Sequence, residues 1–178
     1  LVAGEVFPSF GMTEPDVASS DPTQLQTHAE LEGDEWVING RKWFTSGAGT
    51  AAYTTAMVRT EPDDTPPHAA FSMIIVPTDT VGYNIVRDVA VMGEFDGHYE
   101  VIYDNVRVPK ENLLGTRGHG FKIAQDRLGP GRIFHCMRWL GQAQRAFDLM
   151  CDRANERVAF GKPLAEHQQI QKFIFDTA

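Results

Sequence analysis

The sequence is poor in cysteine, in long apolar runs and in positive charge, and each shortage excludes a class of protein. Its 178 residues include only Cys136 and Cys151, which excludes a disulfide scaffold and a cysteine-rich zinc module. The apolar runs are too short to cross a bilayer. With 16 Lys and Arg against 24 Asp and Glu, the net charge is −8. The chain therefore lacks the positive surface with which proteins wrap nucleic acid or lie on anionic membranes.

The common catalytic and nucleotide-binding motifs are also missing. The sequence contains no phosphate-binding P-loop, no complete G-x-G-x-x-G, no H-E-x-x-H and no G-x-S-x-G. We expect no metal site, because the histidines lack metal-ligand spacing. They are His28, His68, His98, His119, His135 and His167. The composition is typical of a reduced, intracellular, soluble protein.

The first part of the chain shows the alternation and turn residues of antiparallel β-structure. Gly33-Asp34 and Asn39-Gly40 are two-residue hairpin signals, so we expect a meander in which Trp36 pairs with Trp43. Side chains alternate across a strand, which would place Trp43 and Thr45 on one face. The expected strands are Leu25–Glu32, Glu35–Ile38, Arg41–Thr45, Tyr53–Thr60, Ala70–Pro77, Tyr83–Asp88 and His98–Val108. Many short strands indicate a sandwich or barrel.

The second part has helical spacing, which predicts an α+β protein with domains at 1–118 and 119–178. We expect a short helix at Phe121–Leu128, an interruption at Gly129-Pro130-Gly131 and a long helix at Arg132–Arg157. Phe160-Gly161-Lys162-Pro163 should end that helix, and another should begin at Glu166. The chain opens without Met and stops inside an amphipathic helical pattern, so we expect both ends to be cut from a longer protein.

Three segments could carry chemistry, and each has a plainer structural reading. Phe10–Asp21 is a polar loop that could present hydroxyl and N–H groups to a phosphate or flavin edge, or could be a turn. Trp43 and Thr45 could hold a planar ring and its polar edge, or Trp43 could pair with Trp36 in the core. Arg157 could bind a pyrophosphate, or could complement the end of its helix.

Together these segments resemble the acyl-CoA dehydrogenase family. The matching motifs, in the family's order, are Met12-Thr13-Glu14-Pro15, Trp36–Ser46, Asn105–Pro109, Gly120-Phe121 and Arg157–Gly161. The resemblance covers nearly the whole chain. The stretches Asp16–Asp21 and Arg127–Ile133 are similar to a branch with some members fused to a phosphotransferase-like domain. The resemblance implies a fragment of a three-domain α-β-α protein: the middle β-barrel and the first helices of the C-terminal antiparallel bundle.

The resemblance also implies FAD as cofactor and acyl-CoA as substrate. Flavin-contacting positions are matched by Phe10, Met12, Thr13, Trp43, Thr45, Arg157, Phe160, His167 and Gln168. Ser19 and Arg132 match positions that contact the acyl-CoA. Arg157, His167 and Gln168 match contacts to the flavin of a neighbouring subunit, which implies a homo-oligomer, a dimer or tetramer. An electron-transfer flavoprotein is the implied acceptor, and fatty-acid β-oxidation the implied context. The implied compartment is cytoplasmic in a bacterium and mitochondrial or peroxisomal in a eukaryote.

The implied reaction is α,β-dehydrogenation of the thioester, with a carboxylate base and hydride transfer to flavin N5. In most of the family the base would lie beyond Ala178, and Gly131 stands where some branches carry it, so either the base lies outside this segment or the protein does not dehydrogenate. Gly129 and Ala159 also depart from family residues, an aspartate and a threonine. Two alternatives remain: an acyl-CoA oxidase on the same fold, and a non-catalytic module that binds acyl-CoA or flavin.

Overall fold

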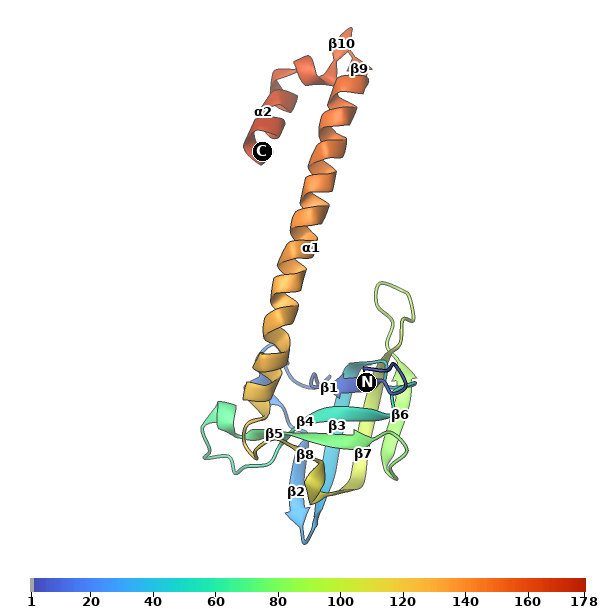
Figure 1. Cartoon of the computed structure of the whole chain (residues 1–178), viewed down its shortest axis with the longest axis vertical. Helices are drawn as coiled ribbons and strands as arrows, with labels where there is room; N and C mark the ends of the chain where they lie inside the picture. Colours follow the sequence, from blue (N-terminus) through green and yellow to red (C-terminus); the bar gives the residue numbers. More distant parts are fainter. Residues whose placement is uncertain (1) are drawn as a thin grey trace. The chain divides into compact units, whose positions relative to one another are not determined.

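The computed structural model describes residues 2–178 and divides into two units. The first unit ends at Gln125 and holds the sheet, and the second runs from Asp126 to Ala178. The long helix α1, Gly120–Glu156, begins in the first unit. A sheet-rich part followed by helices confirms the predicted α+β class (Figure 1). No helix among residues 2–178 combines the length and apolar character needed to cross a membrane.

Eight strands of the first unit form one sheet. Its path is β6-β7-β3-β2-β4-β5-β8, and β1 pairs in parallel with β4. The bounds are β1 Pro8–Gly11, β2 His28–Glu32, β3 Glu35–Ser46, β4 Tyr53–Arg59, β5 Phe71–Pro77, β6 Tyr83–Asp88, β7 His98–Pro109 and β8 Leu113–Leu114. The strands predicted over β4, β5, β6 and β7 are confirmed. They were predictable because each combines apolar alternation with flanking turn residues.

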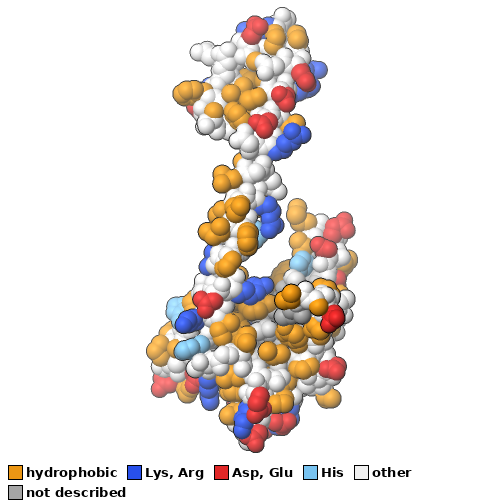
Figure 2. Space-filling model, in the orientation of Figure 1, with side chains coloured by type: hydrophobic (Ala, Val, Ile, Leu, Met, Phe, Trp, Pro, Cys, Tyr) orange, Lys and Arg blue, Asp and Glu red, His pale blue; other side chains and the backbone are white. Residues whose placement is uncertain are grey.

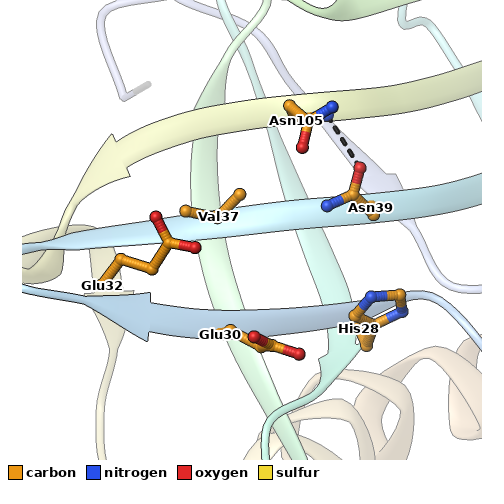
Figure 3. A pocket seen from close by; sticks show the side chains of 6 residues that line it. All are labelled: His28, Glu30, Glu32, Val37, Asn39 and Asn105. Carbon is orange, nitrogen blue, oxygen red and sulfur yellow. Dashed lines mark hydrogen bonds between the residues drawn. The ribbon is translucent and has the colours of Figure 1, made fainter.

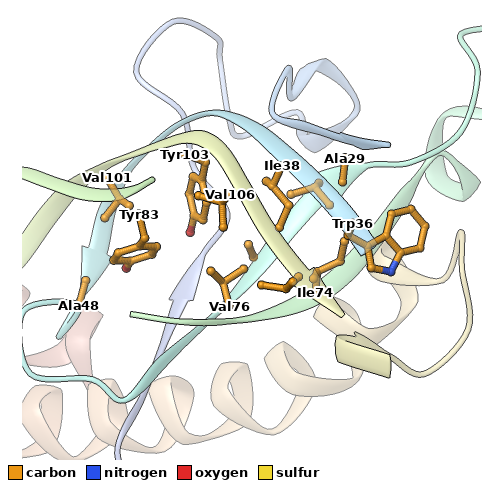
Figure 4. Packing of buried hydrophobic residues seen from close by; sticks show 13 residues of the cluster. Ala29, Trp36, Ile38, Ala48, Ile74, Val76, Tyr83, Val101, Tyr103 and Val106 are labelled. Atoms are coloured by element: carbon orange, nitrogen blue, oxygen red, sulfur yellow. The ribbon is translucent and has the colours of Figure 1, made fainter. Parts of the chain in front are cut away.

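One hydrophobic cluster lies inside the curve of this sheet. Trp36 and Ile38 of β3 pack there with Ile74 of β5, Tyr83 of β6 and Tyr103 of β7 (Figure 4). Strands from both halves of the sheet path thus share one core, so the sheet bends around it. A second cluster covers the other side of β4 and β5 with residues of the loop after β1 and the first turns of α1.

The Gly33-Asp34 hairpin is confirmed, but the Asn39-Gly40 hairpin is wrong. β3 continues through Asn39-Gly40 and pairs with β7, with register shifts between Ile38 and Gly40 and between Lys42 and Thr45. The Asn39 side chain accepts a hydrogen bond from the Asn105 backbone N–H at 2.8 Å. The chain therefore continues as a strand through the dipeptide, where one residue of β3, Asn39, lies opposite two of β7, and the expected pairing of Trp36 with Trp43 does not occur. Trp36 lies opposite Val108 instead.

The predicted helix interruption at Gly129-Pro130-Gly131 is also wrong, because α1 runs through it. Proline costs a helix one hydrogen bond and restricts the preceding residue through that residue's Cβ. Gly129 has no Cβ, which removes part of that restriction. The helix ends at Glu156, and the short strands β9, Val158–Ala159, and β10, Lys162–Pro163, follow it. The second helix, α2, covers Gln168–Thr177.

The middle of α1 presents large apolar side chains to solvent. Figure 2 shows hydrophobic atoms exposed along this helix. They include Ile133, Phe134, Met137, Trp139 and Leu140. Helices gain most of their stability from packing such faces, so this face has the composition of a buried helix surface.

Candidate functional site

The loop after β1 and the second half of β3 meet at one junction. The Trp43 backbone N–H donates to the Thr13 carbonyl oxygen at 3.0 Å. The Thr13 hydroxyl donates to the Trp43 carbonyl oxygen at 2.7 Å. Two sequence segments, singled out separately for their chemistry, therefore lie against each other. The Trp43 side chain is half-buried and leans on the Phe44 ring, with 4.8 Å between the ring centroids.

Phe44 interrupts the regular strand beside this junction. Its φ of +49° lies in the left-handed region, which non-glycine residues seldom adopt. The same-face prediction for Trp43 and Thr45 assumed a regular strand, so the bulge removes its basis. Thr45 is fully buried, whereas Trp43 is half-buried. Among the residues that the structure describes, the Thr45 Oγ1 atom has no hydrogen-bond partner.

A buried ion pair lies directly behind the junction. Lys42 Nζ donates to Glu14 Oε1 at 2.8 Å and to the Met12 carbonyl oxygen at 2.9 Å. Burial raises the pKa of the Glu14 carboxyl, but the Lys42 ammonium and hydrogen bonds from Gln26 and Thr27 outweigh burial and hold that pKa below its ordinary value. Burial lowers the pKa of Lys42 to about 8, even though Glu14 favours its charged form.

Sequence reasoning missed this pair, although both residues stand inside quoted motifs. A lysine is expected on the protein surface, because lysine side chains are almost never fully buried without a partner. No local pattern links two residues that are 28 positions apart. The only available signal was adjacency in the sequence. Glu14 directly follows Thr13, and Lys42 directly precedes Trp43.

The remaining loop residues also have defined places. Phe10 lies on β1, and Phe10 and Met12 both pack against the second hydrophobic cluster. The Ser19 hydroxyl accepts the Glu14 backbone N–H at 2.8 Å and donates to the Glu14 carbonyl oxygen at 3.1 Å. The first unit thus places Phe10 on β1, Met12, Thr13 and Ser19 on the loop after it, and Trp43 and Thr45 on β3.

The other predicted residues belong to the second unit. Arg132 lies on α1, and Arg157 follows the end of that helix, where its carbonyl oxygen accepts the Leu164 N–H at 2.8 Å. Phe160 has a φ of +53° and its side chain is 97% exposed. His167 Nε2 lies 3.2 Å from the Ala159 carbonyl oxygen, immediately before Gln168 opens α2. Arg157, Phe160, His167 and Gln168 therefore gather around the β9–β10 hairpin.

Away from these residues, the sheet carries a polar hollow across β2, β3 and β7. It is lined by His28, Glu30, Glu32, Val37, Asn39 and Asn105 (Figure 3). Within residues 2–178, no three His, Cys, Asp or Glu side chains are grouped so as to hold a metal ion. The dashed contact in Figure 3 is the hydrogen bond from the Asn105 backbone N–H to the Asn39 side chain.

Two family models match the chain in sequence order. The acyl-CoA dehydrogenase middle domain matches residues 9–106, and the C-terminal domain matches residues 118–178. The chain belongs to the acyl-CoA dehydrogenase family. This membership confirms the resemblance drawn from the five motifs.

Individual relatives of the family agree along nearly the whole chain. "Probable acyl-CoA dehydrogenase FadE2" of Mycobacterium tuberculosis is 52% identical, over 98% of this chain and 44% of its own length. "Acyl-CoA dehydrogenase family member 11" of Rattus norvegicus is 45% identical, over 98% of this chain and 23% of its own length. The crystal structure of an acyl-CoA dehydrogenase from Geobacillus kaustophilus has a TM-score of 0.83 and 30% identity, over 99% of this chain and 46% of its own. The chain thus spans less than half the length of these relatives.

Membership of a flavoprotein family raises the question of whether this site fits a flavin. A flavin has a flat apolar ring system and a hydrogen-bonding edge. The half-buried Trp43 indole offers an apolar face. The Thr45 hydroxyl is buried without a partner among residues 2–178, and such a group is costly unless a ligand completes its hydrogen bonding. The residues present therefore fit the ring and edge of a flavin.

Proposed function

We propose that the protein is an FAD-dependent acyl-CoA dehydrogenase that removes hydrogen from the α and β carbons of an acyl-CoA thioester. The observation that carries this proposal is the Thr13–Trp43 junction beside the unpartnered Thr45 hydroxyl, in a chain of this family. A buried hydroxyl without a partner beside a half-buried indole supports the proposal, because a flavin edge would complete the hydrogen bonding of Thr45.

The chain's own residues bind and orient the cofactor. Trp43 supplies an apolar contact to the ring, while Thr13 and Thr45 supply hydroxyls to its polar edge. Phe10 and Met12 anchor the loop that carries Thr13, because both pack on the second cluster. When bound, FAD supplies the redox chemistry by accepting a hydride. The protein contributes position and exclusion of water.

We assign the residues around the β9–β10 hairpin to the flavin of a second copy of this chain. Arg157 and Phe160 are exposed, so both are free to contact another molecule. A guanidinium binds a pyrophosphate through two parallel hydrogen bonds. His167 and Gln168 lie next to them. The protein is accordingly proposed to act as a homo-oligomer, a dimer or tetramer.

The substrate contacts proposed here are Ser19 and Arg132. Ser19 is held by Glu14 at a fixed point of the flavin-edge loop, and Arg132 supplies a cation on α1. The general base is assigned to a carboxylate outside these 178 residues, because Gly131 has no side chain to remove a proton. An electron-transfer flavoprotein is proposed as the acceptor.

The test is anaerobic reduction of the bound flavin in protein expressed from its whole open reading frame. We expect yellow protein whose flavin absorption bleaches on addition of acyl-CoA and returns when electron-transfer flavoprotein is added. Protein that binds no FAD, or whose FAD no acyl-CoA reduces, would contradict the proposal. Hydrogen peroxide formed in step with substrate in air, without another acceptor, would instead identify an oxidase.

A further inference from the structure

Lys42 is fully buried, although lysine side chains are almost always exposed. Its neighbours Arg41 and Trp43 are exposed and half-buried, but the Lys42 side chain is fully buried. The register of β3 against β7 shifts on both sides of Lys42. Lys42 keeps the alternation of the buried Trp36 and Ile38 along β3, so the strand itself places the lysine on the face that carries the core.

The partner of Lys42 is a carboxylate whose two oxygens both accept hydrogen bonds. Glu14 Oε1 accepts the Thr27 backbone N–H at 2.9 Å and Oε2 accepts the Gln26 N–H at 2.7 Å, in addition to the ion pair with Lys42. A buried ion pair of this kind adds little stability compared with apolar residues of similar volume, because both charges lose their hydration. Fold stability alone is therefore a weak reason for this pair.

The pair holds the flavin-edge loop on both sides of Thr13. The Lys42 ammonium binds the Met12 carbonyl and the Glu14 side chain, the residues before and after Thr13. Lys42 itself directly precedes Trp43, whose backbone exchanges hydrogen bonds with Thr13. The same Glu14 binds the Ser19 hydroxyl through its backbone N–H and C=O. One residue thus links the core lysine, the flavin edge and the substrate-side serine.

We propose that Lys42 and Glu14 are positioning residues that hold Thr13 against Trp43 for the flavin and fix Ser19 relative to both. This inference rests on the proposed function, since it concerns how the same site is held. Without the ammonium, the Met12–Glu14 segment loses two contacts to β3, while Thr13 keeps its own hydroxyl. Loss of Lys42 should therefore loosen the geometry of the site without removing any group that touches the flavin.

The experiment compares three variants of the protein expressed from its whole open reading frame. Lys42→Met removes the ammonium, and Lys42→Met/Glu14→Gln removes both charges. Ile74→Ala is the matched control, because Ile74 is fully buried in the first cluster, away from the loop. FAD affinity is measured by titration of apoprotein, and the bound-flavin absorption spectrum, Tm and KM for acyl-CoA are measured on holoprotein.

We expect Lys42→Met to weaken FAD binding about tenfold more than Ile74→Ala weakens it at a similar loss of Tm. It should also shift the bound-flavin spectrum and raise KM, because Ser19 loses its fixed support. Neutralising both charges should restore neither the FAD affinity nor the spectrum, because the Met12–Glu14 segment still lacks its contacts to the ammonium. If Lys42→Met lowers Tm alone and binds FAD like the control, the pair is merely structural and the inference is overturned. If the unsubstituted protein binds no FAD, the proposed function fails first, and this inference fails with it.

Discussion

Replacing Thr45 by valine should have opposite effects on the apoprotein and on cofactor binding. The Thr45 side chain is fully buried on β3, and its hydroxyl has no partner among the described residues. Valine is also β-branched and nearly the same size, so the substitution exchanges the hydroxyl for a methyl group and keeps the packing. The variant therefore isolates the contribution of one buried oxygen atom.

The size of the effect follows from the cost of that unpaired oxygen. A buried hydroxyl without a hydrogen bond costs about 1–3 kcal/mol. Thr45→Val removes this cost, so the apoprotein should become more stable by up to about that amount. If the flavin edge supplies the missing partner, the protein that keeps Thr45 recovers the cost of the unpaired hydroxyl when FAD binds. The variant should then bind FAD about 5- to 150-fold more weakly, since each 1.4 kcal/mol is a factor of ten.

The assay pairs chemical denaturation of apoprotein with FAD titration, and Thr54→Val is its control. Thr54 is equally buried, but its hydroxyl already has partners: Ser9 Oγ at 2.5 Å and Tyr83 OH at 2.7 Å. Thr54→Val should lower apoprotein stability by about 1–3 kcal/mol and leave FAD affinity unchanged. A Thr45→Val apoprotein that is destabilised like Thr54→Val, with normal FAD binding, would refute the reasoning.

Three further outcomes follow from the same structure. Trp43→Ala should weaken FAD binding by about 1–3 kcal/mol, the scale of ring–aromatic stacking; unchanged affinity in a folded variant would contradict the role of Trp43. Gly40→Ala should cost about 3 kcal/mol or more of unfolding free energy, because an added Cβ would lie 2.6 Å from the Thr27 Cα at a φ of +146°. Gly33→Ala, at a φ of +64° but in open space, should cost only about 1–2 kcal/mol, and equal losses would contradict the steric argument. The pKa of Lys42, about 8 against an ordinary 10.5, means that between these values the unfolded chain binds a proton that the folded chain has released. Its contribution to unfolding free energy should therefore rise with pH over that window, and Lys42→Met should lack this rise in denaturation series at successive pH values.

Much of the sheet could be predicted because its signals are local. Tyr83–Asp88 was predicted with the bounds that the structure shows for β6, since turn residues stand on both sides of it. Gly33-Asp34 fixed the register of β2 against β3, which places Ala29 opposite Ile38. The α+β class followed from the change of period along the chain.

The errors came from contacts made far along the chain. Asn39-Gly40 has strong turn propensity, yet Asn39 is held by the backbone of Asn105, 66 residues away. β7 thus outweighs a local preference that a single sequence displays clearly. The predicted helix interruption at Pro130 failed for a different reason. That prediction counted Gly129 as a second helix breaker, whereas a glycine before proline has no Cβ and so relieves part of the strain that proline imposes.

The candidate site was predictable residue by residue but not as an arrangement. Sequence reasoning selected Thr13 and Trp43 separately, and the resemblance joined them by analogy with a family. The structure shows two hydrogen bonds between these residues, 30 positions apart. No periodicity encodes such a contact, because it depends on where the β1 loop returns to the sheet.

The failures and the site coincide on β3, and this coincidence has a physical reason. A regular strand would place Lys42 and Phe44 on one face and Trp43 and Thr45 on the other. One extra residue on β3 between Lys42 and Thr45, where Phe44 has a positive φ, breaks this rule, which leaves Lys42 and Thr45 buried on either side of a half-buried Trp43. A buried cation, a ring contact and an unpaired hydroxyl can then occupy four consecutive residues. Local sequence rules describe strands that only need to pack, and β3 departs from those rules at the residues that the proposed function assigns to holding and contacting the flavin.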